Sequence, residues 1–393
     1  MKTDILIIGS GPAGLSFARS LADSALKVVV VEKMGEDAIA DPAPDGRDIA
    51  LTHRSRQILT DLGALKHIAD EDISPIKEAK VLDGDSPYVL HFDYRRVCDD
   101  ALGYLISNHL IRKALYQEVK AASNVEMVFD SSVKSISPAV DSACVTLSNG
   151  TEITSRLVVA ADSRFSESRR MMGVSASMQD FGRTIVVCQM QHDEPHQGVA
   201  YECFRYGNTL AALPLRGNTS SIVVTVANEQ VDGLLAMSDQ QFGDYARDQL
   251  EGRFGNMSPV GKRFHYPLVA VLANQFYARR FALIGDACVG MHPVTAHGFN
   301  LGLLGQDTLA SLIKEALHKD RDIAPDDLLR TYQSRHRIAS MPLYLGTNAI
   351  VKLYTNDLPV PKILRKAMLR FGNNFSPVKA AITRHLTETH KLT

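Results

Sequence analysis

Three glycines near the N-terminus have the spacing of a phosphate-binding turn. Gly9, Gly11 and Gly14 follow the apolar run of residues 5–8 in the pattern G-x-G-x-x-G. The first glycine of such a pattern allows a tight turn, the second lets a pyrophosphate approach the backbone, and the third lets a helix pack on a strand. Glu32 ends the next apolar run, where a carboxylate can accept hydrogen bonds from ribose hydroxyls. These residues predict a dinucleotide site at a helix N-terminus, rather than a purely structural turn.

A second group of glycines lies near the other end of the chain. Gly285 and Asp286 end the apolar run of residues 281–284, and a G-x-N-x-G pattern begins at Gly298. The Asp286 carboxylate can hold ribityl or ribose hydroxyls, or it can cap the following turn. Glycines at the start of a helix let the backbone lie against a flat ring, and the helix dipole stabilises the negative charge of a reduced flavin by about 0.3–1 kcal/mol. Together the two segments predict a flavin held along its whole length.

The elements that position these residues are expected to form a parallel α/β unit. Short, continuous apolar runs predict buried strands over residues 5–8, 27–31, 157–161 and 281–284. Helical patterns are expected over residues 12–23, 49–62, 104–120 and 298–317, and a loop over residues 38–47. Short β-rich runs over residues 184–190, 209–214 and 221–227, separated by Gly, Asn and Pro, predict an inserted antiparallel sheet.

Composition sets limits on the function. The chain has 393 residues, 45% of them apolar, and a formal net charge of −1, so no global field would draw it to nucleic acid. Its five cysteines contain no C-x-x-C pair, which predicts free thiols in a reducing cytoplasm and no metal site. No apolar stretch reaches the roughly 18 residues that a spanning helix needs. We therefore expect a cytoplasmic protein that binds no metal and no nucleic acid.

The C-terminal segment is locally basic. Residues 351–393 contain eight Lys or Arg against Asp357 and Glu388, with apolar residues interleaved. Such a segment can bind the inner face of an anionic membrane, bind partner subunits of a biosynthetic complex, or form a solvated helical cap. The sequence leaves these three alternatives open.

Several of these motifs together resemble a known family. They are the GSGPAG turn with Glu32, Arg47 in GRDIAL, Arg112 in IRKAL, the Ala161-Asp162 strand end, and the tract from Arg280 through Gly302. On these residues the chain resembles the group A FAD-dependent aromatic hydroxylases, and within them the ubiquinone-biosynthesis hydroxylases. The resemblance implies non-covalently bound FAD. The cofactor-binding residues it implies, together with those argued above, are Gly9, Gly11, Pro12, Ala13, Gly14, Glu32, Lys33, Arg47, Arg112, Asp162, Gly285, Asp286, Pro293, Gly298, Phe299 and Asn300.

The resemblance also implies an activity. The expected reaction is hydroxylation of the aromatic ring of a polyprenylated phenol or quinol in ubiquinone biosynthesis, through a C4a-hydroperoxyflavin. Its other reactants would be O₂ and NAD(P)H or another electron donor. Two alternatives remain: a flavoprotein reductase that saturates isoprenoid double bonds, and a flavin-binding assembly subunit of the same pathway.

The chain departs from the family pattern at two places near the expected flavin. Ser163 follows Asp162 where the family usually has glycine, and His297 stands where it usually has glutamine. Imidazole has a pKa suited to moving a proton near neutral pH, so His297 is the expected catalytic residue. The alternative is a polar residue that only lines the flavin edge. His292 is expected to pack or hydrogen-bond in the preceding turn.

The expected fold class is α/β with an α+β insert. A Rossmann-like FAD-binding domain would comprise residues 1–75, 101–175 and 273–340. A substrate domain built on an antiparallel β-sheet would comprise residues 76–100 and 176–272. A helical, basic C-terminal region would comprise residues 341–393.

Overall fold

The apolar runs of the sequence form the centre of a parallel sheet. The computed structural model describes residues 1–84, 88–96, 100–205, 207–292 and 297–354. β1 (Lys2–Ile8) lies between β2 (Val28–Val31) and β11 (Glu152–Ala160). β8 (Val125–Val128) and β18 (Phe281–Leu283) complete the parallel part, in the order β8-β2-β1-β11-β18. Numbered by chain position this order is 3-2-1-4-5, as in a Rossmann fold. The strands expected from the sequence are confirmed.

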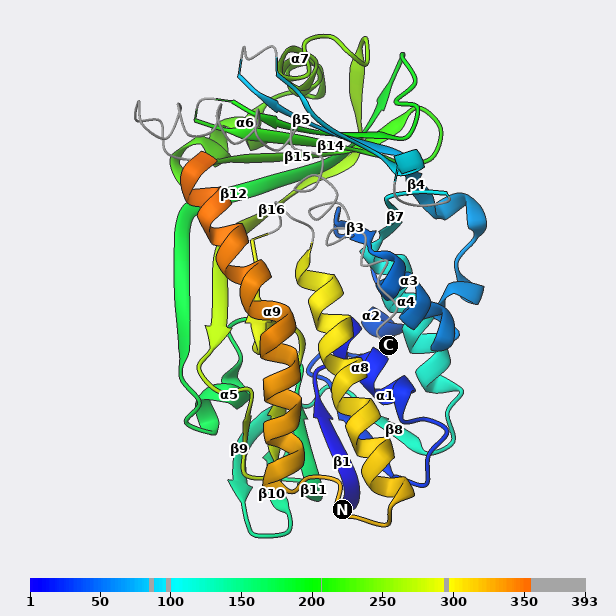
Figure 1. Ribbon diagram of the computed structural model, residues 1–393, viewed down its shortest axis with the longest axis vertical. Coiled ribbons are helices and arrows are strands. Elements are labelled where there is room, and N and C mark those ends of the chain that lie inside the picture. Colours follow the sequence, from blue (N-terminus) through cyan, green and yellow to red (C-terminus); the bar gives the residue numbers. More distant parts are fainter. Residues whose placement is uncertain (85–87, 97–99, 206, 293–296, 355–393) are drawn as a thin grey trace.

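Helices and antiparallel strands complete this part of the molecule. β9 (Val133–Pro138), β10 (Ala143–Leu147) and β17 (Tyr277–Ala278) extend the sheet at its β11 and β18 side. α1 (Pro12–Ser20) packs against both α4 (Asn108–Lys120) and α8 (His297–His318). α8 runs beside α9 (Asp326–Tyr354), as Figure 1 shows. One large apolar core joins these helices to the strands of the sheet.

A second, largely antiparallel sheet lies at the top of Figure 1. Its order is β19-β16-β12-β15-β14-β13-β5-β6, and only the β13–β5 pair is parallel. α6 (Val231–Ala236) and α7 (Asp239–Gln249) cover one face and share a core with it. The strands are β5 (Glu78–Asp83), β6 (Leu90–Asp93), β12 (Ala176–His192), β13 (Val199–Phe204), β14 (Thr209–Pro214), β15 (Thr219–Ala227), β16 (Met257–Ala273) and β19 (Val289–Gly290). The inserted sheet is therefore confirmed.

Two expected helices begin later than the sequence suggested. Residues 49–62 form β3 (Asp48–Leu51) and then α3 (His53–Asp61), with Thr52 as the N-cap. Residues 104–120 form the strand β7 (Gly103–Ser107) before α4. β7 pairs with β3 and with β4 (Ser74–Ile76), so a small antiparallel sheet replaces the first turns of both predicted helices. The prediction was wrong there because β3 and β7 pair across 53 to 59 residues, and local periodicity does not report such a pairing.

The remaining elements are short. The segment expected as a loop over residues 38–47 begins inside α2 (Glu36–Ala40), and α5 (Glu167–Met171) follows β11. The single-turn 3₁₀ helices are η1 (Ala64–His67), η2 (Asp70–Asp72), η3 (Tyr94–Arg96), η4 (Asn228–Gln230) and η5 (Gly285–Ala287). The domain boundaries expected from the sequence stay a prediction.

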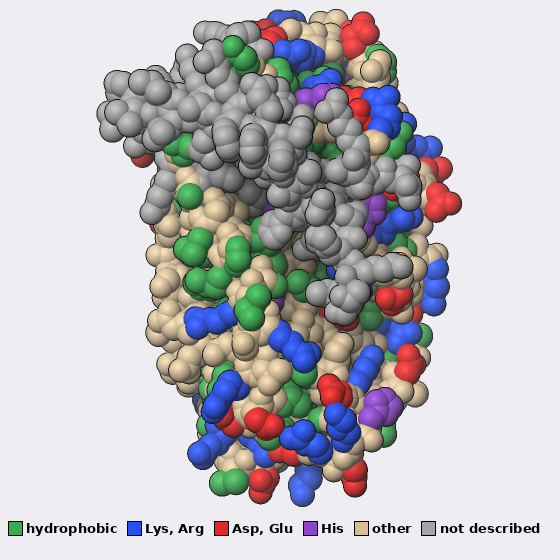
Figure 2. All heavy atoms as spheres, viewed as in Figure 1, with side chains coloured by type: hydrophobic (Ala, Val, Ile, Leu, Met, Phe, Trp, Pro, Cys, Tyr) green, Lys and Arg blue, Asp and Glu red, His purple; other side chains and the backbone are tan. Residues whose placement is uncertain are grey.

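Of the C-terminal region, the structure describes the part that lies in α9. Most of the basic segment, residues 355–393, lies outside the described residues. Hydrophobic side chains gather on the face along α9 (Figure 2), where Ile338 and Leu345 are 75% and 59% exposed. None of the helices in the described ranges is long and apolar enough to span a bilayer. The four described cysteines are free thiols, as expected.

Candidate active site

The first and third glycines of the phosphate turn are required by close backbone contacts. Gly9 has φ +101°, and a Cβ there would lie 2.7 Å from the carbonyl oxygen of Ala161 on the neighbouring strand end. A Cβ on Gly14 would lie 2.0 Å from the carbonyl oxygen of Gly9. Real side chains do not tolerate such approaches, so β1, α1 and β11 can meet here only because both residues are glycine.

The second glycine has the opposite surroundings. Gly11 is the N-cap of α1 with an extended backbone, and a Cβ there would meet no atom within 4 Å. No side chain caps this helix end, and Pro12 occupies its first turn. The free N–H groups of the first turn and the open space beside Gly11 fit a bound diphosphate.

Glu32 is anchored next to this turn at the end of β2. It is 8% exposed, and its Oε2 accepts hydrogen bonds from the backbone N of Ser10 at 2.8 Å and from Ser10 Oγ at 2.7 Å. Its Oε1 accepts from the backbone N of Met34 at 3.0 Å. These bonds fix the carboxylate beside the turn, and its remaining lone pairs can accept ribose hydroxyls. Lys33, also expected to bind the cofactor, is exposed.

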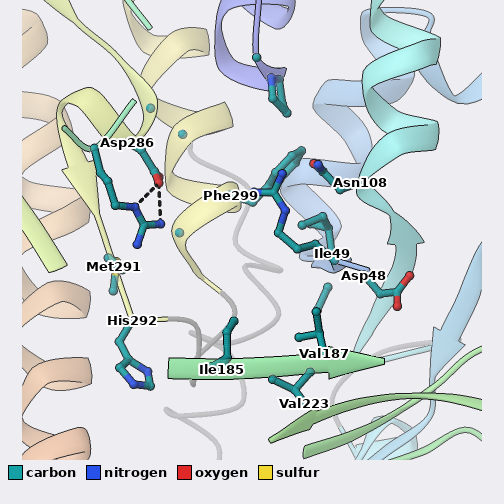
Figure 3. A pocket seen from close by; sticks show the side chains of 18 of the residues that line it. Asp48, Ile49, Asn108, Ile185, Val187, Val223, Asp286, Met291, His292 and Phe299 are labelled. Carbon is teal, nitrogen blue, oxygen red and sulfur yellow. Dashed lines mark hydrogen bonds and ion pairs between the residues drawn. The ribbon is translucent and has the colours of Figure 1, made fainter. Parts of the chain in front are cut away.

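A cavity of about 490 Å³ extends from the phosphate turn to the antiparallel sheet. This volume is within the roughly 300–1,000 Å³ usual for small-molecule sites. Asp286 lies on one side, and Ile185, Val187 and Val223 lie on the opposite side (Figure 3). Of the expected cofactor-binding residues, those that line the cavity are Gly11, Pro12, Ala13, Arg47, Asp162, Gly285, Asp286, Gly298 and Phe299. The structure thus brings together residues from both glycine-bearing segments.

The two arginines expected at the cofactor differ in their partners. Arg47 pairs with Asp45 at 2.6 Å, and its guanidinium lies 5.4 Å from the ring centre of Tyr266. Burial works to lower the pKa of Arg47, but the bond to Asp45 outweighs it and the pKa rises. Arg112 makes no hydrogen bond or ion pair with the described residues, and burial lowers its pKa. A cation left unpaired near Glu32 and Arg47 fits an anionic ligand.

The second glycine segment carries an ion pair that the sequence did not reveal. Asp286 Oδ2 accepts from Arg164 Nη2 at 2.8 Å and from its Nε at 3.2 Å. Gly285 has φ +60°, and a Cβ there would lie 2.8 Å from the Cβ of Ala13, so this turn touches the phosphate turn directly. Asp162 Oδ2 accepts from the backbone N of Ser168, whereas its Oδ1 is buried without a partner among the described residues. That orphaned oxygen, too, is suited to a ligand hydroxyl or N–H.

Only some of the cofactor-binding residues expected at the start of α8 line the cavity. Gly298 and Phe299 line it, whereas Asn300 joins α8 to the β3 end by accepting from Thr52 N at 3.1 Å and donating to Ala50 O at 2.9 Å. His297 is 3% exposed and is not among the lining residues; its catalytic role stays a prediction. Pro293 lies outside the described residues.

His292 lines the cavity instead. Its ring meets Phe181 edge-on with centroids 5.1 Å apart, and burial beside Arg183 and Arg164 lowers the pKa of its imidazole to about 4. His292 is therefore neutral at pH 7. The prediction that it packs in the turn agrees with this contact, but its place on the cavity wall was not foreseen.

Sequence reasoning missed the residues that complete the walls. Asp48, Arg164 and Glu202 are ionisable residues that line the cavity and that the sequence motifs did not single out. The only sequence feature that could have pointed to Arg164 is its position just after the end of a predicted strand. Glu202 is a single acid inside the apolar run of β13, a pattern that points to a special position only once the strand's neighbours are known.

Comparisons with known proteins agree with this geometry. The family described as FAD binding domain matches residues 2–343. The chain is 47% identical over 391 residues to the ubiquinone hydroxylase UbiM of Neisseria meningitidis, covering 98% of this chain and 85% of the relative. It is 32% identical over 393 residues to the ubiquinone hydroxylase UbiL of Rhodospirillum rubrum, covering 99% and 90%. The p-nitrophenol 4-monooxygenase PnpA of Pseudomonas putida superposes with a TM-score of 0.79 at 17% identity, covering 99% of this chain and 100% of that one, which supports the fold.

Three features of the site fit bound FAD: the open space over Gly11, the unpaired Arg112 and the partnerless Asp162 oxygen. The family whose model matches the chain also binds FAD. The chain belongs to the FAD-binding family. Within the FAD-dependent aromatic hydroxylases of that family, it is a member of the ubiquinone-biosynthesis hydroxylases.

Proposed function

We propose that this protein is a FAD-dependent monooxygenase that hydroxylates the aromatic ring of a polyprenylated phenol or quinol in ubiquinone biosynthesis. One observation carries the proposal. A single cavity joins the phosphate turn, with Gly11 and Ala13, to an apolar sheet face that includes Val187 and Val223. The names of the hydroxylase relatives support the substrate class.

The chemistry that FAD supplies when bound is the activation of O₂ with electrons from a reduced donor. The chain's own residues would bind the cofactor, orient the substrate and shield both from water. The uncapped first turn of α1 and Arg112 would hold the diphosphate, and Glu32, fixed by Ser10, would hold the ribose. Gly298 and Phe299 line the cavity at the start of α8 and would contact the flat ring of the cofactor. The apolar side chains of Ile185, Val187 and Val223 would keep water away from the reacting ring.

His297 is proposed to hold or move a proton at the flavin edge. The natural comparison is His297→Gln, because glutamine is what the resembled family usually has at this position. We expect His297→Ala to slow single-turnover hydroxylation and to change its pH profile, and His297→Gln to flatten the profile with a smaller loss of rate. An unchanged rate and profile in His297→Ala would remove the catalytic role.

We further propose that the C-terminal region holds the protein on an anionic membrane surface. The exposed Ile338 and Leu345 on α9 and the basic composition of residues 351–393 support this. Flotation with liposomes that contain anionic lipid should recover the full chain, and a variant that ends at residue 354 should remain in the dense fraction. Equal flotation of the two proteins would contradict the proposal.

The proposed activity is tested by complementation. Strains of a ubiquinone-making bacterium that each lack one ring hydroxylase should recover ubiquinone when they express this chain, for at least one of the ring positions. The accumulated quinone intermediates are weighed by mass spectrometry. Failure to restore ubiquinone in every one of these strains, with folded, FAD-containing protein in the cells, would contradict the proposal.

A further inference from the structure

The antiparallel sheet turns one regular face toward the cavity. Its strands align Val187 on β12 with Val223 on β15, Val223 with Ala211 on β14, and Ala211 with Glu202 on β13. Residues aligned in this way lie on the same face of a sheet. All four line the cavity. The row is apolar except at its end, where it carries a carboxyl group.

Glu202 has no protein partner in this position. It makes no hydrogen bond or ion pair with the described residues, and its strand neighbours Ala211 and Val81 are uncharged. The other ionisable residues that line the cavity are Arg47, Asp48, Asp162, Arg164, Asp286 and His292. Arg47 pairs with Asp45, Asp48 accepts from Ser107 and Gln189, and Arg164 pairs with Asp286. None of these groups satisfies Glu202.

An unpartnered acid on an apolar wall costs stability. Burial alone raises the pKa of Glu202 to about 8, so the group is a neutral carboxylic acid at pH 7. In that form it has one O–H to donate and oxygens that can accept. A carboxyl group on a cavity wall without a partner in the protein is readily explained if a ligand supplies the partner.

We propose that Glu202 is a substrate-positioning residue, whose carboxyl group hydrogen-bonds an oxygen substituent of the aromatic ring and so determines which ring carbon faces the cofactor. The inference rests on the proposed function, because it takes the occupant of this end of the cavity to be a phenol or quinol. The apolar row from Val187 to Ala211 would contact the ring itself, and Glu202 would supply the directional bond.

The test compares three variants of the FAD-loaded protein. Glu202→Gln keeps a neutral hydrogen-bonding group of the same shape, Glu202→Leu keeps the bulk but removes hydrogen bonding, and Glu78→Gln is the control. Glu78 is a carboxylate on β5 of the same sheet, paired with His91 and Lys80 and absent from the cavity wall. The probe is 2-geranylphenol, and its binding is followed by the change in flavin fluorescence between pH 6 and pH 9.

We expect Glu202→Leu to weaken binding at pH 7 by about tenfold, the usual value of one hydrogen bond. In the wild type, binding should weaken above about pH 8 as the acid ionises and loses its proton to donate. Glu202→Gln should bind within about threefold of the wild type at pH 7 and show no such weakening. Glu78→Gln should follow the wild-type curve. Glu202→Leu should also yield a broader mixture of hydroxylated isomers.

Folding of the variants provides a separate check. The pKa of Glu202 is higher in the folded chain than its ordinary 4.5, so the wild type loses stability as pH rises from 4.5 to about 8. The melting temperature of Glu202→Leu should therefore fall less than that of the wild type over this range. If Glu202→Leu binds the probe as tightly as the wild type and with the same pH dependence, the inference is wrong, but the proposed function is not affected. If the wild type neither binds nor hydroxylates any prenylated phenol or quinol, the proposed function fails, and the inference fails with it.

Discussion

The two ends of the cavity are built in different ways. At the phosphate turn, backbone approaches below 3 Å leave glycine as the only residue that fits at positions 9 and 14, and Ser10 holds Glu32 in place. At the antiparallel sheet, the wall is a row of medium-sized apolar side chains with Glu202 at its end. The first end is fixed by backbone geometry, and the second by which residues happen to share a face. We therefore expect positions 9 and 14 at the cofactor end to tolerate no larger residue, and the substrate end to change specificity before it loses stability.

The largest effect is expected for Gly14→Ala. The new methyl group would lie about 2.0 Å from a carbonyl oxygen that cannot move without displacing β1. We expect a loss of about 3 kcal/mol or more in the free energy of unfolding, because the added methyl group would be caught between the backbone of Gly9 and the side chain of Ala161. The control is Gly233→Ala in α6, where a Cβ meets no atom within 4 Å and the stability should hold or rise. Urea denaturation of the two apoproteins measures both free energies of unfolding. Equal stability of the two variants would contradict the claim that backbone geometry fixes the cofactor end.

Gly11→Ala should separate cofactor binding from folding. Its Cβ has free space in the protein itself, so the stability of the apoprotein should change by less than about 1 kcal/mol. The methyl group would occupy the space where the diphosphate meets the helix N-terminus. Loss of one hydrogen bond to a charged group predicts FAD binding weaker by about tenfold to a hundredfold. Fluorescence titration of apoprotein with FAD measures this; unchanged affinity would place the diphosphate elsewhere.

Ala211→Leu should act at the other end only. The larger side chain would fill part of the cavity between Val223 and Glu202, so the affinity for a prenylated phenol should fall by about tenfold, while the affinity for FAD stays within about twofold. Val260→Leu, on a half-exposed position of β16 outside the cavity wall, is the matched control. A parallel loss of FAD binding in Ala211→Leu would show that the two ends are not independent.

The smallest effect concerns the helices behind the phosphate turn. Burial alone would raise the pKa of Glu118, but hydrogen bonds from Lys66, His67 and Arg19 outweigh it and lower the pKa to about 2. A depressed carboxyl pKa stabilises the fold above its ordinary value of 4.5, and that stabilisation is lost as pH falls toward 2.

Glu118→Gln should therefore be less stable than the wild type by about 1 kcal/mol at pH 7, a value reduced by the solvent exposure of Lys66. The difference should vanish near pH 2. Thermal unfolding between pH 7 and pH 2 measures the two curves, and a constant offset at every pH would show that Glu118 acts by packing and not by charge.

The contrast between the two ends also explains what the sequence predicted. Gly9, Gly11, Gly14 and Glu32 lie within one short βαβ segment, so the roles proposed for them follow from local spacing. The pairing of β3 with β7 joins residues 53 to 59 positions apart, and both strands were mistaken for the first turns of helices. Arg164 meets Asp286 across 122 residues, which no local pattern reports.

Glu202 shows the same limit more sharply. Its strand was not among the β-rich runs identified in the sequence, and its place in the cavity depends on the registers of β12 to β15 together. A single acid in an apolar strand is ambiguous until its neighbours are known. Residues that act through long-range register therefore needed the structure, whereas those that act through local backbone geometry did not.

The proposed activity is tested most directly by following the source of the new oxygen atom. The purified, FAD-loaded protein is given a reduced electron donor and a prenylated phenol or quinol under ¹⁸O₂, and the product is weighed. We expect one ¹⁸O atom on the aromatic ring and no product without oxygen. A product that gains two hydrogen atoms in the isoprenoid tail under anaerobic conditions, with no ring ¹⁸O under oxygen, would contradict the account.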